Sequence, residues 1–263
     1  MDFNEKGFLG TAIGEFIQSV ESRYSDFFET CYRVNELAHD TRSQLKVHNH
    51  DGQEVFAASI FIRLHNGFQG TVILARMGMV IDAKTVLRGT LESLFILKLL
   101  CEDKTFVAEY VGSDQVRRLK WMNVALQTKD PNFDSVRKHA TPEVIEKLKQ
   151  EINQHKWKEL SAADVARRAQ LQSLYDTDYR LLSEETHTLP RSLEHLTSAD
   201  DTGDITGFEW GPSDESLDYI LFTAIRVLFI ALVSVTKLFS IDKKEELTKV
   251  DQDLTHLASL LKA

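Results

Sequence analysis

The sequence contains few of the residues that interrupt helices or cross-link a chain. Its 263 residues include only 4 prolines, 12 glycines and 2 cysteines. So few helix breakers over this length favour long helices. The cysteines, Cys31 and Cys101, belong to no Cys-x-x-Cys motif, so no disulfide framework is indicated. A reducing compartment suits such a chain, and we expect it to be cytoplasmic.

A secretory leader and a membrane span are also not expected. The first six residues lack the basic start and apolar core of a signal peptide. The stretch 219–239 is apolar enough to resemble a membrane helix, but Arg226 lies inside it and Lys237 lies near its end. A central charge is costly in lipid. We interpret this stretch as a buried core helix and expect no membrane contact.

Basic residues are outnumbered, and the formal net charge is −9. A negative chain repels nucleic-acid phosphate unless a local basic patch overrides the mean. Lysine and arginine are concentrated between Arg117 and Arg168, close to Trp121 and Trp157. Acidic residues are interleaved there, so most of these cations are expected to form surface pairs. RNA is therefore a possible partner that the net charge does not favour.

Apolar residues recur at steps of three and four along most of the chain, which is typical of amphipathic helices. This periodicity predicts helices over residues 5–46, 54–77, 82–102, 105–127, 142–157, 174–188, 215–239 and 243–261, with a short helix that opens at Ser161. The 82–102 segment is apolar on nearly all sides, so we expect it at the centre. We predict an all-α, multi-helix bundle with long antiparallel helices and no substantial sheet. A single domain would span residues 1–263, with a core bundle at about 54–262 and a long N-terminal helix at about 5–46.

Two charged residues, Arg88 and Glu92, stand four positions apart on this most apolar segment. Charged side chains are rarely buried unless they are paired. They form either a structural ion pair that fixes helix register or a site that faces a pocket, since perturbed charges gather at functional sites. The sequence leaves both interpretations open.

A second group of polar residues recurs at every fourth position, at Tyr175, Tyr179, Ser183 and His187. This spacing places them on one face of a helix. They either bond to a neighbouring helix, or His187 acts as a general acid–base with Ser183 and Tyr179 as donors. No Gly-x-Ser-x-Gly motif occurs and no acid is fixed as a third member, so a serine-hydrolase triad is not indicated.

Metal binding is a further alternative. Two Glu-x-x-His steps, Glu36 with His39 and Glu184 with His187, match part of the ligand pattern of helical di-iron proteins, and Glu92 could add a ligand. Nine histidines in a Glu-rich chain give about one such step by chance. We therefore expect no cofactor and no metal, with a carboxylate-bridged metal protein kept as the alternative.

The segment 198–218 is strongly acidic. It holds seven acidic residues, no lysine or arginine, three glycines and a proline. A loop of this length in a compact domain is usually functional or disordered. We expect it to be a loop, and under the hypothesis of an interaction module it is the candidate contact for a protein partner.

Two blocks of the sequence together match a known pattern. One runs from Leu74–Gly78 through Val86–Glu92, and the other is Tyr175–His187. Together they resemble the family DUF5677, an uncharacterised and mainly bacterial family, over roughly residues 55–200. The family pattern has an Arg-x-x-x-Glu step on an apolar helix and a later Tyr-x-x-x-Ser-x-x-x-His step. The matching residues here are Arg88, Glu92, Tyr179, Ser183 and His187.

The resemblance implies no established activity, but it implies that the two blocks meet in space. Arg88 and Glu92 would then face Ser183 and His187 between packed helices, where bundles build their sites. The block Tyr175–His187 also looks like helices in abortive-infection and HEPN-like proteins.

A separate Arg-x5-His pair, Arg33 and His39, resembles the ribonuclease motif of HEPN proteins. In that family the two residues act on RNA without a metal, generally at a dimer interface. This pair lies outside the region that resembles DUF5677, and it is otherwise interpreted as a solvated helix face.

The function hypotheses come from different classes. The first is a bacterial defence or stress-response protein that cleaves RNA without metal, with His187 as acid–base and Arg88 stabilising phosphate charge. Glu92 weighs against it, because a paired Arg88 is kept from substrate. The alternative is a non-enzymatic interaction or sensor module whose polar cluster is structural. In either case we expect a homodimer.

Overall fold

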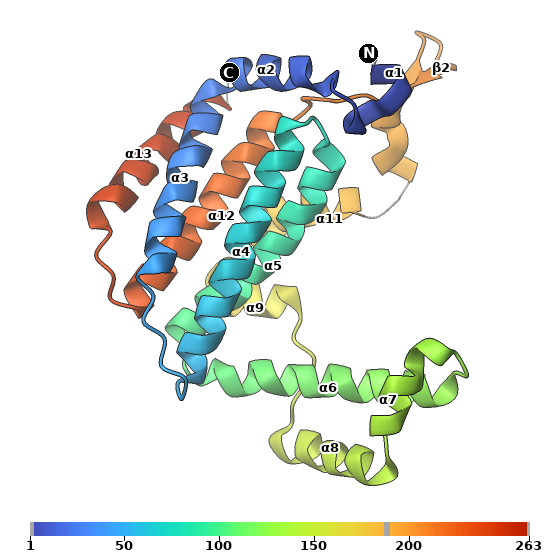
Figure 1. The fold of residues 1–263 in the computed structure, drawn as a ribbon, viewed down its shortest axis with the longest axis vertical. Helices are drawn as coiled ribbons and strands as arrows, with labels where there is room; N and C mark the ends of the chain where they lie inside the picture. Colours follow the sequence, from blue (N-terminus) through green and yellow to red (C-terminus); the bar gives the residue numbers. More distant parts are fainter. Residues whose placement is uncertain (1–2, 187–189, 262–263) are drawn as a thin grey trace.

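The computed structural model describes residues 3–186 and 190–261, and this part of the chain is almost wholly helical (Figure 1). Its elements in chain order are α1 (Phe3–Lys6), η1 (Gly7–Leu9), α2 (Ile13–Arg23), α3 (Ser25–Ser43), α4 (Gly52–Arg76), α5 (Val80–Glu102), α6 (Phe106–Gln127), η2 (Pro131–Phe133), α7 (Asp134–His139), α8 (Pro142–His155), α9 (Ala162–Arg168), α10 (Gln172–Leu174), η3 (Tyr175–Tyr179), α11 (Arg180–Thr186), η4 (Pro190–Leu196), β1 (Thr197–Ala199), β2 (Ile205–Phe208), α12 (Leu217–Leu238) and α13 (Lys244–Leu260). The prediction of an all-α bundle without a substantial sheet is confirmed.

The core is built around α5, the segment that the sequence places at the centre. This helix packs against α4, α12, α11 and α9, and Leu87, Leu91 and Leu94 are fully buried. A helix that is apolar on all sides excludes water only when neighbours cover each face. α4 and α12 lie beside α5, and α3 and α13 pack against α12 on the far side (Figure 1).

Helices α6, α7 and α8 form an arm, residues 106–158, that extends from one end of the bundle (Figure 1). They pack together through a small core of their own, made by Met122, Ala140, Ile145 and Leu148. Gly112 lies against Trp157, where an added Cβ would come within 2.2 Å of the indole. This close approach holds the chain after α8 against the first half of α6.

The prediction of one long N-terminal helix over residues 5–46 is wrong. The structure divides this segment into α1, η1, α2 and α3. Gly7 has a φ of +53°, a left-handed conformation that glycine adopts readily, and Tyr24 between α2 and α3 has a φ of −111° and a ψ of 33°. The apolar spacing continues across Tyr24 because α2 and α3 both contribute to the same core.

The second half of the chain departs from prediction in three places. The segment 198–218, expected to be a loop, contains most of β1 and all of β2, which pair antiparallel. In addition, α7 occupies an expected gap between helices. The strands have three and four residues, too few for alternation to mark them. The helix predicted over 174–188 consists of α10, the π-helix η3 and α11.

Among the described residues, α12 is the one helix long and apolar enough to cross a membrane. Of its most apolar window, 67% is buried inside the bundle. Arg226, in the middle of α12, forms an ion pair with Asp178 of η3 at 2.7 Å. The apolar surface of α12 is therefore used in the protein core, as the sequence predicts.

Candidate functional site

A π-helical turn determines how the site is built. In η3 the consecutive residues Asp178 and Tyr179 are both buried, although they point to different neighbours. The Asp178 carboxylate bonds to α12, whereas the Tyr179 hydroxyl bonds to α5. Wide π turns occur as short insertions in helices, frequently at functional sites. Here the turn fixes Tyr179 against Arg88 and Glu92.

The polar residues predicted from the two sequence blocks do meet, and they form a continuous network. Arg88 donates from Nε to Ser183 Oγ at 3.0 Å and from Nη2 to the Tyr179 hydroxyl at 2.8 Å. The Tyr179 hydroxyl donates to Glu92 Oε1 at 2.7 Å, and Arg88 Nη2 lies 3.3 Å from the same oxygen. Ser183 donates to the backbone carbonyl of Tyr179 at 2.7 Å. Two segments about ninety residues apart are thereby joined.

The network keeps Tyr179 in its neutral form. Burial, followed by the hydrogen bond and the negative charge of Glu92, raises the pKa of Tyr179 to about 12, and the positive charge of Arg88 opposes the shift. A phenol with this pKa donates a hydrogen bond at neutral pH but does not act as a base. Ser183 directs its proton to a carbonyl and is not activated as a nucleophile by any described residue.

A cleft of about 620 Å³ opens beside this network, between α4, α5, α6 and α9. Small-molecule sites are typically clefts of roughly 300–1,000 Å³ with apolar linings and a few polar groups. The apolar lining is made by Phe56, Ile60, Phe95, Ile96, Leu160 and Val165. Glu92 and Tyr179 also line the cleft, so the network forms one of its walls.

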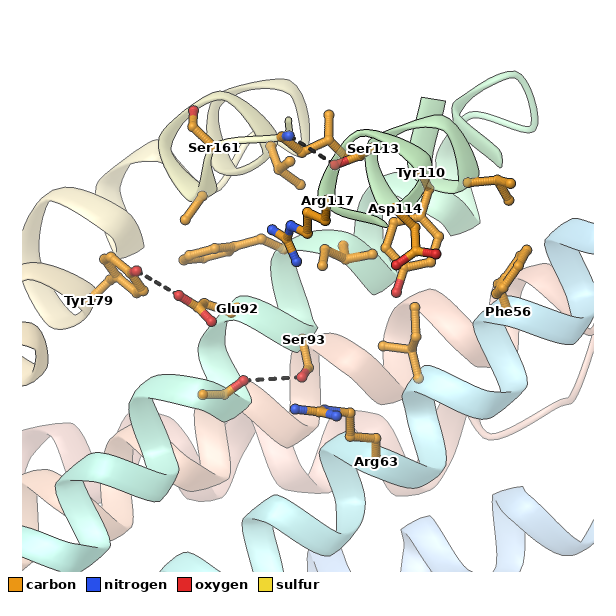
Figure 2. Close-up of a pocket in the computed structure, with 18 residues that line it drawn as sticks. Phe56, Arg63, Glu92, Ser93, Tyr110, Ser113, Asp114, Arg117, Ser161 and Tyr179 are labelled. Carbon is orange, nitrogen blue, oxygen red and sulfur yellow. Dashed lines mark hydrogen bonds between the residues drawn. The ribbon is translucent and has the colours of Figure 1, made fainter. Parts of the chain in front are cut away.

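Two arginines face this space from opposite sides. Figure 2 shows Arg63 reaching in from α4 and Arg117 from α6, with Glu92 and Tyr179 toward one end and Asp114 toward the other. Arg117 is 3.3 Å from Glu159, whereas Arg63 has no hydrogen-bond or ion-pair partner among the described residues. An unpaired guanidinium beside an apolar lining is available to bind an anion. Arg63 was not predicted from the sequence, because nothing in its local pattern distinguishes it from a surface arginine.

A second network, centred on the buried Asp178, was not predicted from the sequence. Asp178 accepts hydrogen bonds from Arg226 at 2.7 Å, Tyr219 at 3.0 Å and Thr223 at 3.2 Å. Burial and the charge of Asp178 raise the pKa of Tyr219 above its usual range. Arg226 inside an apolar stretch was the available signal, because a buried cation requires an acidic partner. The network fixes η3 to α12.

The remaining predicted site residues are placed elsewhere. His187 lies outside the residues that the structure describes. Arg33 bonds to Asp253 at 2.8 Å, and His39 bonds to Arg42 at 2.9 Å. The Arg33 bond links α3 to α13, and His39 also bonds to Gln69 of α4 at 3.0 Å. Neither Arg33 nor His39 lines the cleft.

Within the described ranges, no group of three or more His, Cys, Asp or Glu side chains is positioned to hold a metal ion. Glu36 and His39 therefore belong to no such group in the described ranges, and Glu92 is bonded to Tyr179 and Arg88. The step of Glu184 with His187 falls partly outside the described residues.

The fold and the cleft define an all-helical protein with a polar network at one wall of an inter-helix site. Residues 54–205 match the model of the family of unknown function DUF5677, and the chain belongs to this family. The matched region includes Arg88, Glu92, Tyr179 and Ser183, whereas Arg226 lies beyond it. No curated protein and no solved structure matches the chain. None of these comparisons connects it with HEPN proteins.

Proposed function

We propose that this protein is a non-enzymatic sensor module whose cleft binds a small organic anion with an apolar body. The observation that carries the proposal is Arg63, a guanidinium without a partner in the described part of the chain, which faces an apolar-lined cleft opposite Arg117 (Figure 2). Guanidinium groups bind carboxylate, phosphate and sulfonate groups through paired hydrogen bonds. The apolar lining receives the rest of the ligand.

The acidic residues at the ends of the cleft add selectivity. Glu92 and Asp114 accept hydrogen bonds and repel a second anionic group on the ligand. A ligand that places its anionic group between Arg63 and Arg117 and a hydroxyl or amino group toward Glu92 pairs with the arginines and with the acidic residue. A simple inorganic anion leaves the apolar lining unused and binds more weakly.

The Arg88 network supports a binding role more than a catalytic one. Two donor nitrogens of Arg88 are already used by Ser183 and Tyr179, and Glu92 lies beside it. An arginine held in this way stabilises the wall of the cleft and has less capacity to follow charge that develops on a substrate.

The test uses anilinonaphthalene sulfonate as an amphipathic anionic probe, with fluorescence titration and thermal shift as readouts. We expect Arg63→Gln to weaken binding at least about tenfold, since a charge-assisted hydrogen bond contributes about 1.5–3 kcal/mol. Arg180→Gln is the matched control, because Arg180 is exposed and lies outside the cleft lining. Equal affinity in the parent and both variants would refute an anion site at Arg63.

Ribonuclease activity is the second candidate. It is favoured because Arg88 of α5 bonds to Tyr179 and Ser183, which lie on the two elements that immediately precede His187 in the chain. Purified protein is incubated with total bacterial RNA in EDTA, with His187→Ala in parallel. The sensor proposal expects no cleavage by either. Cleavage by the parent alone, with the variant folded, would assign a metal-independent nuclease and overturn the sensor proposal.

The biological setting that we propose is bacterial defence or stress response in the cytoplasm. It rests on the looser likeness of the block Tyr175–His187 to abortive-infection proteins. Deleting the gene and measuring phage plating and survival of starvation tests this setting independently of the cleft.

A further inference from the structure

The charge of this chain is distributed unevenly between the arm and the rest. Residues 106–158 contain ten lysines and arginines and seven acidic residues, a net charge of +3, although the whole chain carries −9. The remainder therefore carries −12. Opposite charges on separate parts of one molecule favour association between copies when geometry allows the parts to meet.

The arm has a groove with the chemistry of a protein interface. A hollow of about 560 Å³ between α6 and α7 is lined by Arg117, Arg118, Trp121 and His139 among others. Trp121 is 61% exposed and stacks on Phe133 with ring centroids 6.1 Å apart. Exposed tryptophan and arginine together are enriched at binding hot spots. Arg118 has no ion-pair partner among the described residues.

The complementary surface is the β1–β2 hairpin. Its turn is preorganised, because Asp200 Oδ1 accepts hydrogen bonds from the backbone amides of Thr202 and Asp204. Ile205 and Phe208 are 63% and 72% exposed. Exposed apolar side chains on an ordered hairpin, flanked by acidic residues, mark an interaction site.

The two surfaces are arranged for a reciprocal contact. The arm and the hairpin project from opposite ends of the bundle toward the same side (Figure 1). A two-fold axis between two copies therefore brings each arm against the hairpin of the other copy. Two-fold symmetry is the closed symmetry of most homodimers. Two contacts per dimer also double the buried area, which stable interfaces need.

We propose that the arm groove at Trp121 binds the acidic hairpin of a second copy of this chain, forming a two-fold dimer with two identical contacts. Arg118 and Lys138 lie on the arm, and Asp201 and Asp204 lie at the hairpin turn. The arm groove shares Asp114 and Arg117 with the cleft, but the proposal does not depend on the proposed function, because it rests on Arg118, Trp121 and Lys138, none of which lines the cleft.

The test measures molar mass by light scattering and sedimentation over a concentration series. We expect the parent to be a dimer that dissociates as salt is raised, because surface charge pairs are screened. The arm variant Arg118→Glu/Lys138→Glu and the hairpin variant Asp201→Lys/Asp204→Lys should each be shifted to monomer. Circular dichroism and melting temperature establish that both remain folded, and Trp121→Ala tests the groove without a change of charge.

Mixing the two charge-reversed variants distinguishes this interface from any other. The mixed dimer has one contact between unchanged surfaces and one between surfaces with both charges reversed, so we expect it to form where neither variant forms a dimer alone. A monomeric parent, or a parent dimer that none of the variants weakens, would overturn the proposal. If the parent is monomeric and binds a labelled single-stranded RNA, and Trp121→Ala abolishes that binding, the groove is assigned to nucleic acid instead.

Discussion

The hydroxyl of Tyr179 is the connecting group in the wall of the cleft, and its removal gives a sharp test. Tyr179→Phe deletes the donor to Glu92 and the acceptor for Arg88. The ring and its stack with Tyr175, with centroids 4.9 Å apart, are retained. Arg88 keeps its contacts with Ser183 and Glu92.

The size of the effect depends on how much water replaces the lost group. A hydrogen bond to a charged partner contributes about 1.5–3 kcal/mol. The side chains of Arg88 and Glu92 are 25% and 40% exposed, so water can reach part of the vacated position. We expect a loss of about 2 kcal/mol in the free energy of unfolding, and a fall of roughly 4–8 °C in Tm.

Urea and thermal unfolding measure this loss, with Tyr175→Phe as the matched control. The Tyr175 hydroxyl has no hydrogen-bond partner among the described side chains, so its removal should change stability by less than about 0.5 kcal/mol. The pH dependence gives a second signature. Because the pKa of Tyr179 is raised to about 12, the unfolded phenol ionises first, and parent stability should fall as pH rises from about 10 toward 12.

Tyr179→Phe should lack this alkaline loss from Tyr179. Equal stability of Tyr179→Phe and Tyr175→Phe, with the same pH dependence as the parent, would refute the argument that the Tyr179 hydroxyl connects α5 to η3.

Three further substitutions test the packing and the charges. Burial, and then the charges of His39 and Arg42, lower the pKa of His65 to about 4, so the unfolded state takes up the proton first as pH falls. The parent should therefore lose about 2 kcal/mol of stability at this residue between pH 7 and pH 5. His65→Gln should abolish that loss, and the exposed His256→Gln is the control. Asp178→Ala removes the buried acidic partner of Arg226, whose own side chain is 32% exposed, and should cost about 2–4 kcal/mol in urea unfolding. The exposed Asp176→Ala should cost less than about 1 kcal/mol, and an equally small loss at Asp178 would contradict a stabilising role for the ion pair. Gly112→Ala forces a methyl into Trp157 and should cost about 1–3 kcal/mol by calorimetry, whereas Gly14→Ala, which meets nothing within 4 Å, should not destabilise.

The bundle was predictable because its long helices bury one or more faces over many turns. α4, α5, α6 and α12 appear within a few residues of their predicted limits, and Asp51 caps α4 through two backbone amides. Amphipathic spacing does not reveal a break when both sides of the break pack on one core. This is why Tyr24, between α2 and α3, was not recognised as a boundary.

The candidate site was partly predictable for a different reason. Arg88 and Glu92 are conspicuous on an apolar helix, and Tyr179 and Ser183 follow a four-residue spacing. The cleft was not predictable, because it requires α6 and α9 to lie over α5, and their relative position depends on side-chain contacts far apart in the sequence. Arg63 becomes informative only when its surroundings are known.

The π turn explains how the two buried networks depend on each other. Asp178 and Tyr179 are neighbours in the chain, yet one is held by Arg226 of α12 and the other by Glu92 of α5. If Asp178 loses its partner, the turn is free to relax toward the regular α-helical spacing, and Tyr179 rotates away from Glu92. The cleft wall is therefore held from the opposite side of η3 by α12, a helix that does not line the cleft. Substitution of Asp178 should consequently weaken binding of the anionic probe, although the Asp178 side chain does not line the cleft.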